Sequence, residues 1–335
     1  MKAFFAKLFG LFALLLLLLI STASAQNKPQ MYFSDSTATG TSLAKDPIVV
    51  KFQGRYLMYY SRKVSNDSSN GMLGWDIGIA ESKDLYNWVK IGELKPEAAY
   101  EKKGLCAPGA LVKNGKVHLF YQTYGNGPKD AICHAVSADG IHFIRDNSNP
   151  IFHPAAGNWT NGRAIDAEVY FFKNQYFLYY ATRDSSGVIQ QQGVATAPAN
   201  TDFSRDTWKQ ATDSSILKPT LTWEGKCIEG ATVIKRNNKL YLFYAGNYNN
   251  APQQIGVAES TDGITWRRLS NKPFLENGKP GTWNSSESGH PCIFENDNGD
   301  TYLFYQGNNN QGKTYFLSNL KVGWDKSGPY VLNKQ

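Results

Sequence analysis

One unit of about sixty residues recurs five times between residues 46 and 324, and this repeat limits the fold more than any other feature of the chain. Each unit contains two apolar runs joined by a tight polar turn, which predicts a β-hairpin. The second run of each hairpin is rich in aromatic residues: YLMYY (56–60), VHLFY (117–121), YFLYY (176–180), YLFY (241–244) and YLFY (302–305).

Two more strands complete each unit. In units one, two and four the turn between them follows the pattern S-x-D-x-x-x-W/F, in which Asp caps the turn, while units three and five keep only the Trp. Four strands in each of five units predict an all-β chain folded as a five-bladed β-propeller with four-stranded blades. A sandwich with a second domain would not give one period over this length. We expect the tryptophans of the outer strands to pack between blades; these are Trp88, Trp208, Trp266 and Trp324.

The first 25 residues have the pattern of a secretory signal peptide. Lys2 and Lys7 precede a short apolar run, and the small residues STASA end at a predicted cleavage site after Ala25. A transmembrane anchor is the alternative, but the apolar run is short and ends in a cleavage-type sequence. We therefore expect a secreted or periplasmic protein without a membrane anchor, with residues 26–335 as one propeller catalytic domain and a monomer in solution.

Charge and cysteine content narrow the class of protein. The formal net charge is +7, but Lys and Arg are scattered, so a nucleic-acid partner is not expected. No group of Cys and His has zinc spacing. The four cysteines could form two disulfides in an oxidising compartment, in any of three pairings, or remain as free buried thiols in a large core; they are Cys106, Cys133, Cys227 and Cys292.

Acidic residues recur where the first strand of the unit begins. The five aligned positions hold Asp46, Ala107, Asp166, Glu229 and His290, separated by 61, 59, 63 and 61 residues. In a propeller the innermost strands run the same way, so these positions meet at one mouth of the central channel. Like charges brought together raise each other's pKa values and cost stability. An Asp that caps a turn explains one such residue but not three acids and a His, so this cluster predicts a functional site.

Such a cluster suits glycoside hydrolysis. An inverting enzyme needs a general base to activate water and a general acid to protonate the leaving oxygen, with room for the water between them. A third carboxylate can keep the acid protonated and orient it.

Three stretches resemble glycoside hydrolase family 43, the five-bladed propeller enzymes that cut arabinose- and xylose-containing polysaccharides. KDPIVVKFQGRYLMYYS resembles the family's blade-one segment and implies that Asp46 is the general base. AIDAEVYFFKNQYFLYYATRD resembles the blade-three segment and implies that Asp166 tunes the pKa of the acid. IEGATVIKRNNKLYLFYAG resembles the blade-four segment and implies that Glu229 is the general acid.

The resemblance also bears on metal binding. SGHPCIFE places His290 where many family members have a His that binds a structural calcium ion through water, and no cofactor is required for catalysis. A neutral His packed at the channel wall is the other interpretation. Glu168 shares a strand face with Asp166 and could line the channel, although we expect it to have a salt-bridged structural role.

Aromatic residues in the loops at the same mouth are candidates for substrate binding, because sugars stack their C–H faces on aromatic rings. Packing between blades is the alternative for each of them. Arg183 follows the aromatic strand of the third unit and could donate to a sugar hydroxyl or a catalytic carboxylate, or lie exposed on the surface. The candidates for substrate contact are Trp75, Trp159, Arg183, Trp223, Trp283 and His290.

Together these features predict a secreted, inverting, exo-acting glycosidase of oligo- or polysaccharides. α-L-Arabinofuranosidase is the first expectation, followed by β-D-xylosidase or exo-β-galactanase. A retaining fructosidase like those of family 32 is one alternative, but LAKDPIVV lacks a WMNDPNG-like segment and AIDAE lacks RDP. A non-catalytic sugar-binding propeller is another alternative, although it would not need Asp46, Asp166 and Glu229 together.

Overall fold

The computed structural model describes residues 30–64 and 74–332. Within these ranges the chain is built of β-strands and four single-turn 3-10 helices, η1 (Ala99–Glu101), η2 (Gly127–Lys129), η3 (Arg205–Thr207) and η4 (Thr222–Glu224). The unit that contains all the strands begins at Met31. The predicted signal peptide, residues 1–25, lies outside the described residues.

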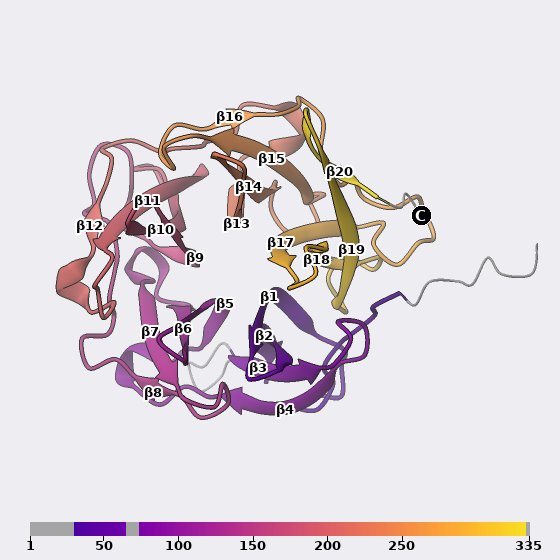
Figure 1. Cartoon of the computed structure of the whole chain (residues 1–335), viewed down its shortest axis with the longest axis horizontal. Coiled ribbons are helices and arrows are strands. Elements are labelled where there is room, and N and C mark those ends of the chain that lie inside the picture. Colours follow the sequence, from indigo (N-terminus) through magenta and orange to yellow (C-terminus); the bar gives the residue numbers. More distant parts are fainter. Residues whose placement is uncertain (1–29, 65–73, 333–335) are drawn as a thin grey trace, which may run out of the picture. The chain divides into compact units, whose positions relative to one another are not determined.

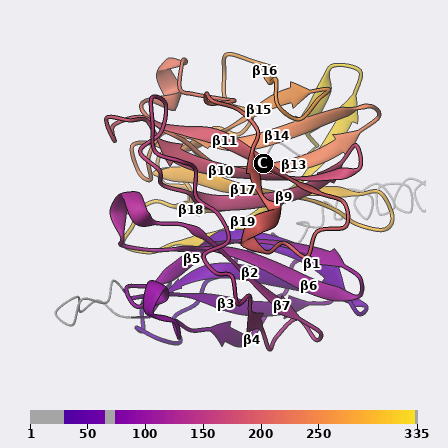
Figure 2. The ribbon, with the colours of Figure 1, turned by 90° about the vertical axis from the view of Figure 1, so that its left-hand side faces the viewer.

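The strands form five separate four-stranded antiparallel sheets, each with its strands in sequence order. The first strand of each sheet lies nearest the centre (Figure 1), and the side view shows the sheets packed face to face (Figure 2). This confirms the predicted five-bladed propeller. The blades are β1 (Ala44–Phe52), β2 (Arg55–Lys63), β3 (Trp75–Ser82), β4 (Val89–Leu94); β5 (Leu105–Lys113), β6 (Lys116–Thr123), β7 (Ile132–Ser137), β8 (Ile144–Arg145); β9 (Ile165–Phe172), β10 (Gln175–Arg183), β11 (Gln190–Pro198), β12 (Lys209–Gln210); β13 (Ile228–Arg236), β14 (Lys239–Gly246), β15 (Gln254–Ser260), β16 (Arg267–Arg268); and β17 (Glu287–Glu295), β18 (Thr301–Asn308), β19 (Phe316–Asp325), β20 (Gly328–Val331).

Every innermost strand has a β-bulge near its start. The register breaks between Lys45 and Ile48 in β1, and at the same place in the other four innermost strands. One residue of each bulge has a left-handed backbone with φ between 42° and 58°, a conformation that is rare for residues other than glycine. These five residues are Asp46, Ala107, Asp166, Gly230 and His290.

This list corrects the sequence alignment of the repeat in one blade. Glu229 was expected to be equivalent to Asp46 and Asp166, but Gly230 holds that position in β13. Glu229 instead has the register position of Lys45, one residue before the bulge. The reason is that the bulge, and not the first acidic residue, defines the repeat.

The backbone N–H groups of three of the five bulge residues are bonded to the preceding blade. Asp46 N donates to Gln306 Oε1 at 2.8 Å, and Asp166 N donates to Gln122 Oε1 at 2.9 Å. In blade two, Ala107 N donates in the same way to a Ser61 hydroxyl at 2.7 Å. The blades are therefore held in register by hydrogen bonds at the level of the acidic residues.

A second layer of bonds between blades lies two residues further along the innermost strands. Val233 N donates to Glu168 Oε1 at 3.0 Å, and Ile293 N donates to Thr232 Oγ1 at 3.2 Å. Glu168 is buried, and among the described residues it forms no ion pair. The expected salt bridge is therefore wrong: Glu168 accepts a backbone N–H from the next blade, as Thr232 does.

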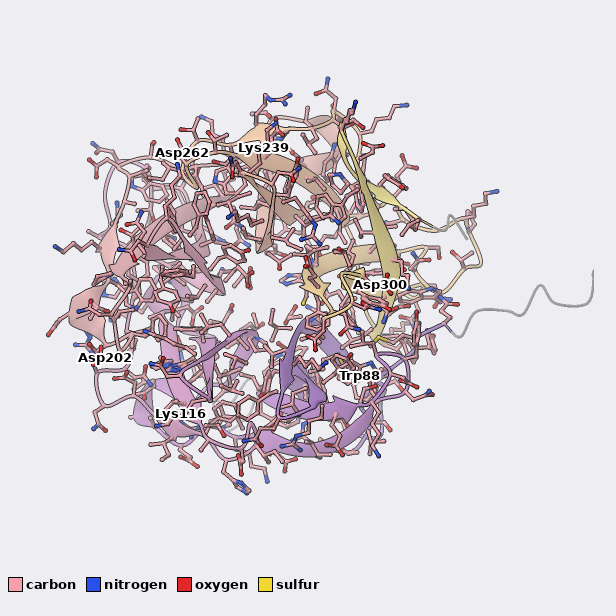
Figure 3. The ribbon with its side chains drawn as sticks, viewed as in Figure 1. Trp88, Lys116, Asp202, Lys239, Asp262 and Asp300 are labelled. Carbon is pink, nitrogen blue, oxygen red and sulfur yellow. The ribbon has the colours of Figure 1, made fainter. Side chains whose placement is uncertain are left out.

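The outer strands pack through aromatic pairs that cross from one blade to the next. Ring centroids are 5.0 Å apart for Trp324 and Tyr241, and 5.8 Å apart for Trp266 and Tyr179. Trp88 packs across the boundary between the last and first blades, and Figure 3 places it outside the innermost strands. The predicted packing role of the outer tryptophans is confirmed, including that of Trp208, which joins a cluster shared by blades two and three.

The predicted turn motif has the expected bonding. In blade four, Asp262 Oδ1 accepts the backbone N–H groups of Ile264 and Thr265 at 2.8 and 2.7 Å, while Ser260 Oγ accepts that of Gly263 at 2.9 Å. Asp262 lies at the outer edge in Figure 3. These turns therefore stand on the periphery and take no part in the axial cluster.

The segment before β1 closes the ring against the last blade. Phe33 and Leu317 exchange backbone hydrogen bonds of 2.9 and 2.7 Å, and Ser318 Oγ donates to Met31 O at 2.6 Å. Met31 is fully buried in the core cluster of blade one. The ring is therefore closed by hydrogen bonds and apolar burial between residues nearly 290 positions apart.

All four cysteines are free and buried. The structure therefore supports the free-thiol alternative, since the packing between blades leaves no need for covalent links. Among the described residues, no helix has the length and apolar character needed to cross a bilayer.

Glu168→Gln should make stability less dependent on pH. Burial raises the pKa of Glu168 to about 8, above its ordinary value of 4.5. The folded state thus favours the neutral form of Glu168. The stability that this preference contributes is complete below pH 4.5 and is lost as the pH rises through 8. We expect the variant to unfold like the wild type at pH 4, and to be more stable by roughly 2–4 kcal/mol at about pH 9, in urea titrations followed by tryptophan fluorescence.

Glu276→Gln is the control, because Glu276 is exposed. Its stability should follow that of the wild type at both pH values. Equal stability of Glu168→Gln and wild type at the higher pH would contradict a neutral Glu168 in the fold.

Thiol titration checks the cysteine assignment. The protein purified without reductant and then unfolded in guanidinium should react with four equivalents of a maleimide, because the four cysteines are free. Two or no reactive thiols, measured as the mass of the intact protein, would instead require disulfides.

Candidate active site

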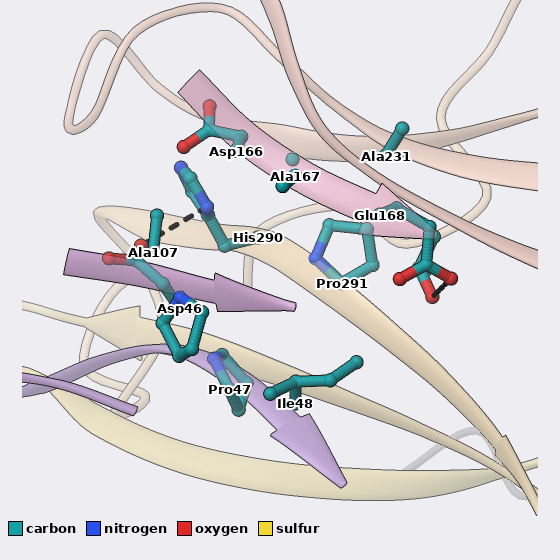
Figure 4. A pocket seen from close by; sticks show the side chains of 13 residues that line it. Asp46, Pro47, Ile48, Ala107, Asp166, Ala167, Glu168, Ala231, His290 and Pro291 are labelled. Carbon is teal, nitrogen blue, oxygen red and sulfur yellow. Dashed lines mark hydrogen bonds and ion pairs between the residues drawn. The ribbon is translucent and has the colours of Figure 1, made fainter. Parts of the chain in front are cut away.

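A cavity of about 160 Å³ lies at the mouth of the channel where the innermost strands begin. A smaller cavity of about 30 Å³ continues along the axis. Figure 4 shows Asp46, Asp166 and His290 gathered at one end of the smaller cavity and Glu168 at the other. The larger cavity is lined by Lys45, Asp46, Cys106, Ala107, Gln122, Tyr124, Arg163, Ile165, Asp166, Arg183, Gln190, Glu229, Tyr248, Asn249 and His290.

His290 stands between two of the predicted catalytic acids. Its Nδ1 lies 3.1 Å from Asp46 Oδ1, and its Nε2 lies 3.1 Å from Glu229 Oε1. Burial alone would lower the pKa of His290, but the charges of Asp46, Glu229 and Asp166 outweigh it and raise this pKa to about 10. Since both ring nitrogens face carboxylates, the protonated imidazolium is favoured over the neutral His at the channel wall that was one expectation from the sequence.

Glu229 accepts hydrogen bonds from three directions. Gln253 Nε2 donates to Oε1 at 2.7 Å, Gln190 Nε2 donates to Oε2, and His290 lies beside Oε1. Burial would raise the pKa of Glu229, but the bond and charge of His290, with help from Lys45, hold this pKa well below its ordinary value. Side chains of blades three, four and five thus fix the carboxylate in one orientation.

Asp166 has the opposite protonation preference. Burial and the charges of Glu229 and Asp46 raise its pKa to about 7, although the charges of His290 and Arg163 oppose the shift. Its Oδ2 atom is buried and has no hydrogen-bond partner among the described residues. Asp166 therefore holds a proton in mildly acidic solution, next to a carboxylate that is ionised.

Lys45 is a site residue that the sequence reasoning missed. Its ammonium group donates to Asn249 Oδ1 at 3.0 Å and lies 4.8 Å from the ring centre of Tyr315. Burial would lower the pKa of Lys45, but nearby negative charges, Asp46 and Glu287 among them, raise it. A usable signal was present, because Lys45 directly precedes Asp46 in KDPIVV and so stands in the register position of Glu229.

Of the six residues predicted to contact substrate, His290 and Arg183 line the cavity. Trp75 stands at its edge, with its ring 5.7 Å from the Lys45 ammonium and 6.3 Å from the ring of Tyr124. These three residues remain candidates for sugar contact.

The other three tryptophans serve packing. Trp223 stacks on Tyr244 at 5.9 Å, and its indole N–H donates to Asn271 O. Trp283 packs on Tyr305, and Trp159 packs against the cluster shared by blades two and three. None of the three is among the described residues that line the axial cavities, because their rings point between strands and loops.

The structural calcium ion implied by the resemblance stays a prediction. Asp166, Glu229 and His290 each offer one ligand atom, and these atoms lie within 4.8 Å of one another. Calcium takes about six to eight oxygen ligands, so most of its ligands at this place would have to be water molecules in the cavity of about 160 Å³ that the three residues line.

The sequence profile of the glycosyl hydrolases family 43 matches residues 38–328, which include all five bulges. The chain belongs to this family. Family 43 enzymes are glycosidases that invert configuration and need no cofactor for catalysis. The alternatives of a family 32 fructosidase and of a non-catalytic sugar-binding propeller are therefore wrong.

Solved structures share the family 43 fold. A thermostable family-43 glycoside hydrolase has a TM-score of 0.70 and 20% identity, with 90% of this chain and 97% of that chain covered. An α-L-arabinofuranosidase from Lactobacillus brevis has a TM-score of 0.67 and 16% identity, covering 88% and 95%. An exo-1,5-α-L-arabinanase from a bovine ruminal metagenomic library has a TM-score of 0.63 and 17% identity, covering 89% and 99%.

Alanine substitution should distinguish the predicted substrate contact of Trp75 from the packing role of Trp283 in this family 43 enzyme. Trp283→Ala is expected to cost about 2 kcal/mol of stability and leave KM unchanged, because the ring is a packing residue. Trp75→Ala is expected to raise KM about threefold to tenfold with a smaller loss of stability. Unfolding curves and Michaelis–Menten kinetics on the same preparations check both, and the reverse pattern would place the sugar at Trp283.

Proposed function

We propose that the protein is an exported, exo-acting, inverting α-L-arabinofuranosidase that removes terminal pentosyl residues from plant-type polysaccharides. The observation that supports it most is the placement of Asp46 and Glu229 on opposite sides of one imidazole ring. The basic, apolar and small-residue pattern of residues 1–25 supports export. The likeness to an arabinofuranosidase and to an exo-arabinanase supports the choice of sugar and the exo action.

The spacing of the two carboxylates suits inversion. Two contacts of 3.1 Å and the width of the His290 ring separate Asp46 Oδ1 from Glu229 Oε1. Inverting enzymes hold their two carboxyl groups about 6.5–9.5 Å apart, and retaining enzymes about 5 Å apart. A ring between the two groups is consistent with the larger gap, and the attacking water would bind in the cavity of about 160 Å³ that both groups line.

In the proposed mechanism Asp46 is the general base. It removes a proton from water as the water oxygen attacks the anomeric carbon, and Glu229 gives a proton to the leaving glycosidic oxygen. Glu229 is ionised in the free site, while Asp166 and His290 hold protons. Glu229 therefore has to take up a proton before it can act as the acid, either from solvent or from Asp166, whose carboxyl oxygen lies within 4.8 Å of that of Glu229. Gln190 and Gln253 orient the carboxylate for this transfer.

The cavity volume favours removal of single sugars. A space of about 160 Å³ with the three acids at its base holds one terminal residue better than a continuous chain. Polar side chains on its wall, including Asn249 and Gln122, can bond the hydroxyl groups of that residue.

Glu229→Gln should reduce activity according to the leaving group. On natural arabinosides kcat is expected to fall by a factor of about 10²–10⁴, because their leaving oxygen needs a proton. On aryl arabinofuranosides, whose phenolate leaves without protonation, we expect a much smaller fall. Initial rates on both substrates, with β-D-xylosides and β-D-galactosides as further members of the panel, measure the ratio.

Asp46→Asn is the matched control, since loss of the base should reduce the rate equally on both classes of substrate. Proton NMR of the first product formed should show inverted configuration. Retention, or an equal loss on both substrates in Glu229→Gln, would contradict the assigned roles.

A further inference from the structure

Two arginines of blade three form part of the cavity wall. Arg163 lies just before β9 and Arg183 is the last residue of β10, and both line the cavity that contains Asp46 and Glu229. The two segments are joined by a backbone bond of 3.0 Å from Asn161 N to Arg183 O. Two guanidinium groups thus face one side of the space proposed for substrate.

The two arginines differ in how their charges are balanced. Arg163 pairs with buried Asp130 at 3.2 Å, and Asp130 is itself held by the backbone N–H of Asn126. Arg183 has no carboxylate within ion-pair distance in residues 30–64 and 74–332. It donates only to neutral oxygens, Gln190 Oε1 and Gly187 O, both at 3.4 Å. The charge of Arg183 is therefore available to a ligand.

The position of Arg183 relative to Glu229 shows which part of a substrate would meet it. Gln190 accepts from Arg183 and donates to Glu229 Oε2, so one side chain connects the guanidinium with the proposed acid. The ring of Tyr248 lies 5.8 Å from the guanidinium carbon and supports it from one side. Since the general acid lies beside the leaving oxygen, Arg183 stands next to the sugar on the leaving side of the bond.

We infer that Arg183, assisted by Arg163, binds a carboxylate of the leaving sugar, so that the enzyme acts on pentosyl residues attached to uronic acid-containing polysaccharides. A guanidinium presents paired N–H donors that match the two oxygens of a carboxylate. Neutral sugars need only hydroxyl partners, which the asparagine and glutamines of the cavity already offer. This inference rests on the proposed function for the position of the acid and adds the chemical class of the substrate.

The test compares one substrate in two charge states. Arabinosylated pectin and glucuronoarabinoxylan are used as such and after carbodiimide–borohydride reduction, which converts each carboxylate to a primary alcohol. We expect the wild type to release pentose from at least one acidic form with a kcat/KM about tenfold higher than from its reduced form. In Arg183→Gln this ratio should fall towards one, and high salt should lower the ratio of the wild type.

Arg267→Gln is the matched control, because Arg267 is exposed on the outer strand β16. It should keep the wild-type ratio. A ratio of one for the wild type on both polysaccharides, or an equal loss on acidic and reduced forms in Arg183→Gln, would overturn the inference.

Two further measurements separate this inference from the proposed function. Turnover of a neutral aryl arabinofuranoside tests the function without any carboxylate. Affinity electrophoresis in gels that contain native or reduced pectin tests carboxylate binding without turnover. Retardation by native pectin that is lost in Arg183→Gln would support the inference even if no arabinoside were cleaved, whereas hydrolysis with equal retardation in both gels would retain the function and reject the inference.

Discussion

The hydrogen bond from a bulge N–H to the preceding blade is the interaction on which the site depends. Asp46 and Asp166 have left-handed backbones, and their N–H groups are bonded to Gln306 and Gln122. A left-handed conformation is unfavourable for these residues and persists only where surrounding contacts enforce it. The bulge turns the side chain from the strand face towards the channel mouth. The acids are therefore held in position by the same contacts between blades that assemble the ring.

Charge balance explains why three carboxylates can share a buried space. His290 and Lys45 bring two positive charges to the cluster, and Asp166 stays largely protonated below a pH of about 7. Burial of like charges without such partners would cost far more than the fold could offset. The same balance leaves Glu229 ionised, so the resting site holds its protons on groups other than the proposed acid.

Much of this architecture could be predicted from the sequence, because each blade repeats the same order of apolar strands and polar turns. Asp46 and Asp166 were found in this way. The register of Glu229 could not be found, since a one-residue bulge leaves the spacing almost unchanged. The packing of Trp159, Trp223 and Trp283 was missed for a related reason: their distance from the strand start says nothing about the direction of the ring. Lys45, Gln190 and Gln253 were missed because contacts between blades leave no local pattern.

Closure of the ring by residues before β1 has a consequence for synthesis. Phe33 is made early and its partner Leu317 nearly last, so this pairing cannot form while the chain is growing. Blade one is therefore without its final neighbour until blade five is complete, and the Gln306 partner of Asp46 is absent for the same period. The acidic residues at the mouth of the channel can reach their final arrangement only when translation of the propeller is almost finished. A polypeptide released before blade five would have most of its sheets and no organised base.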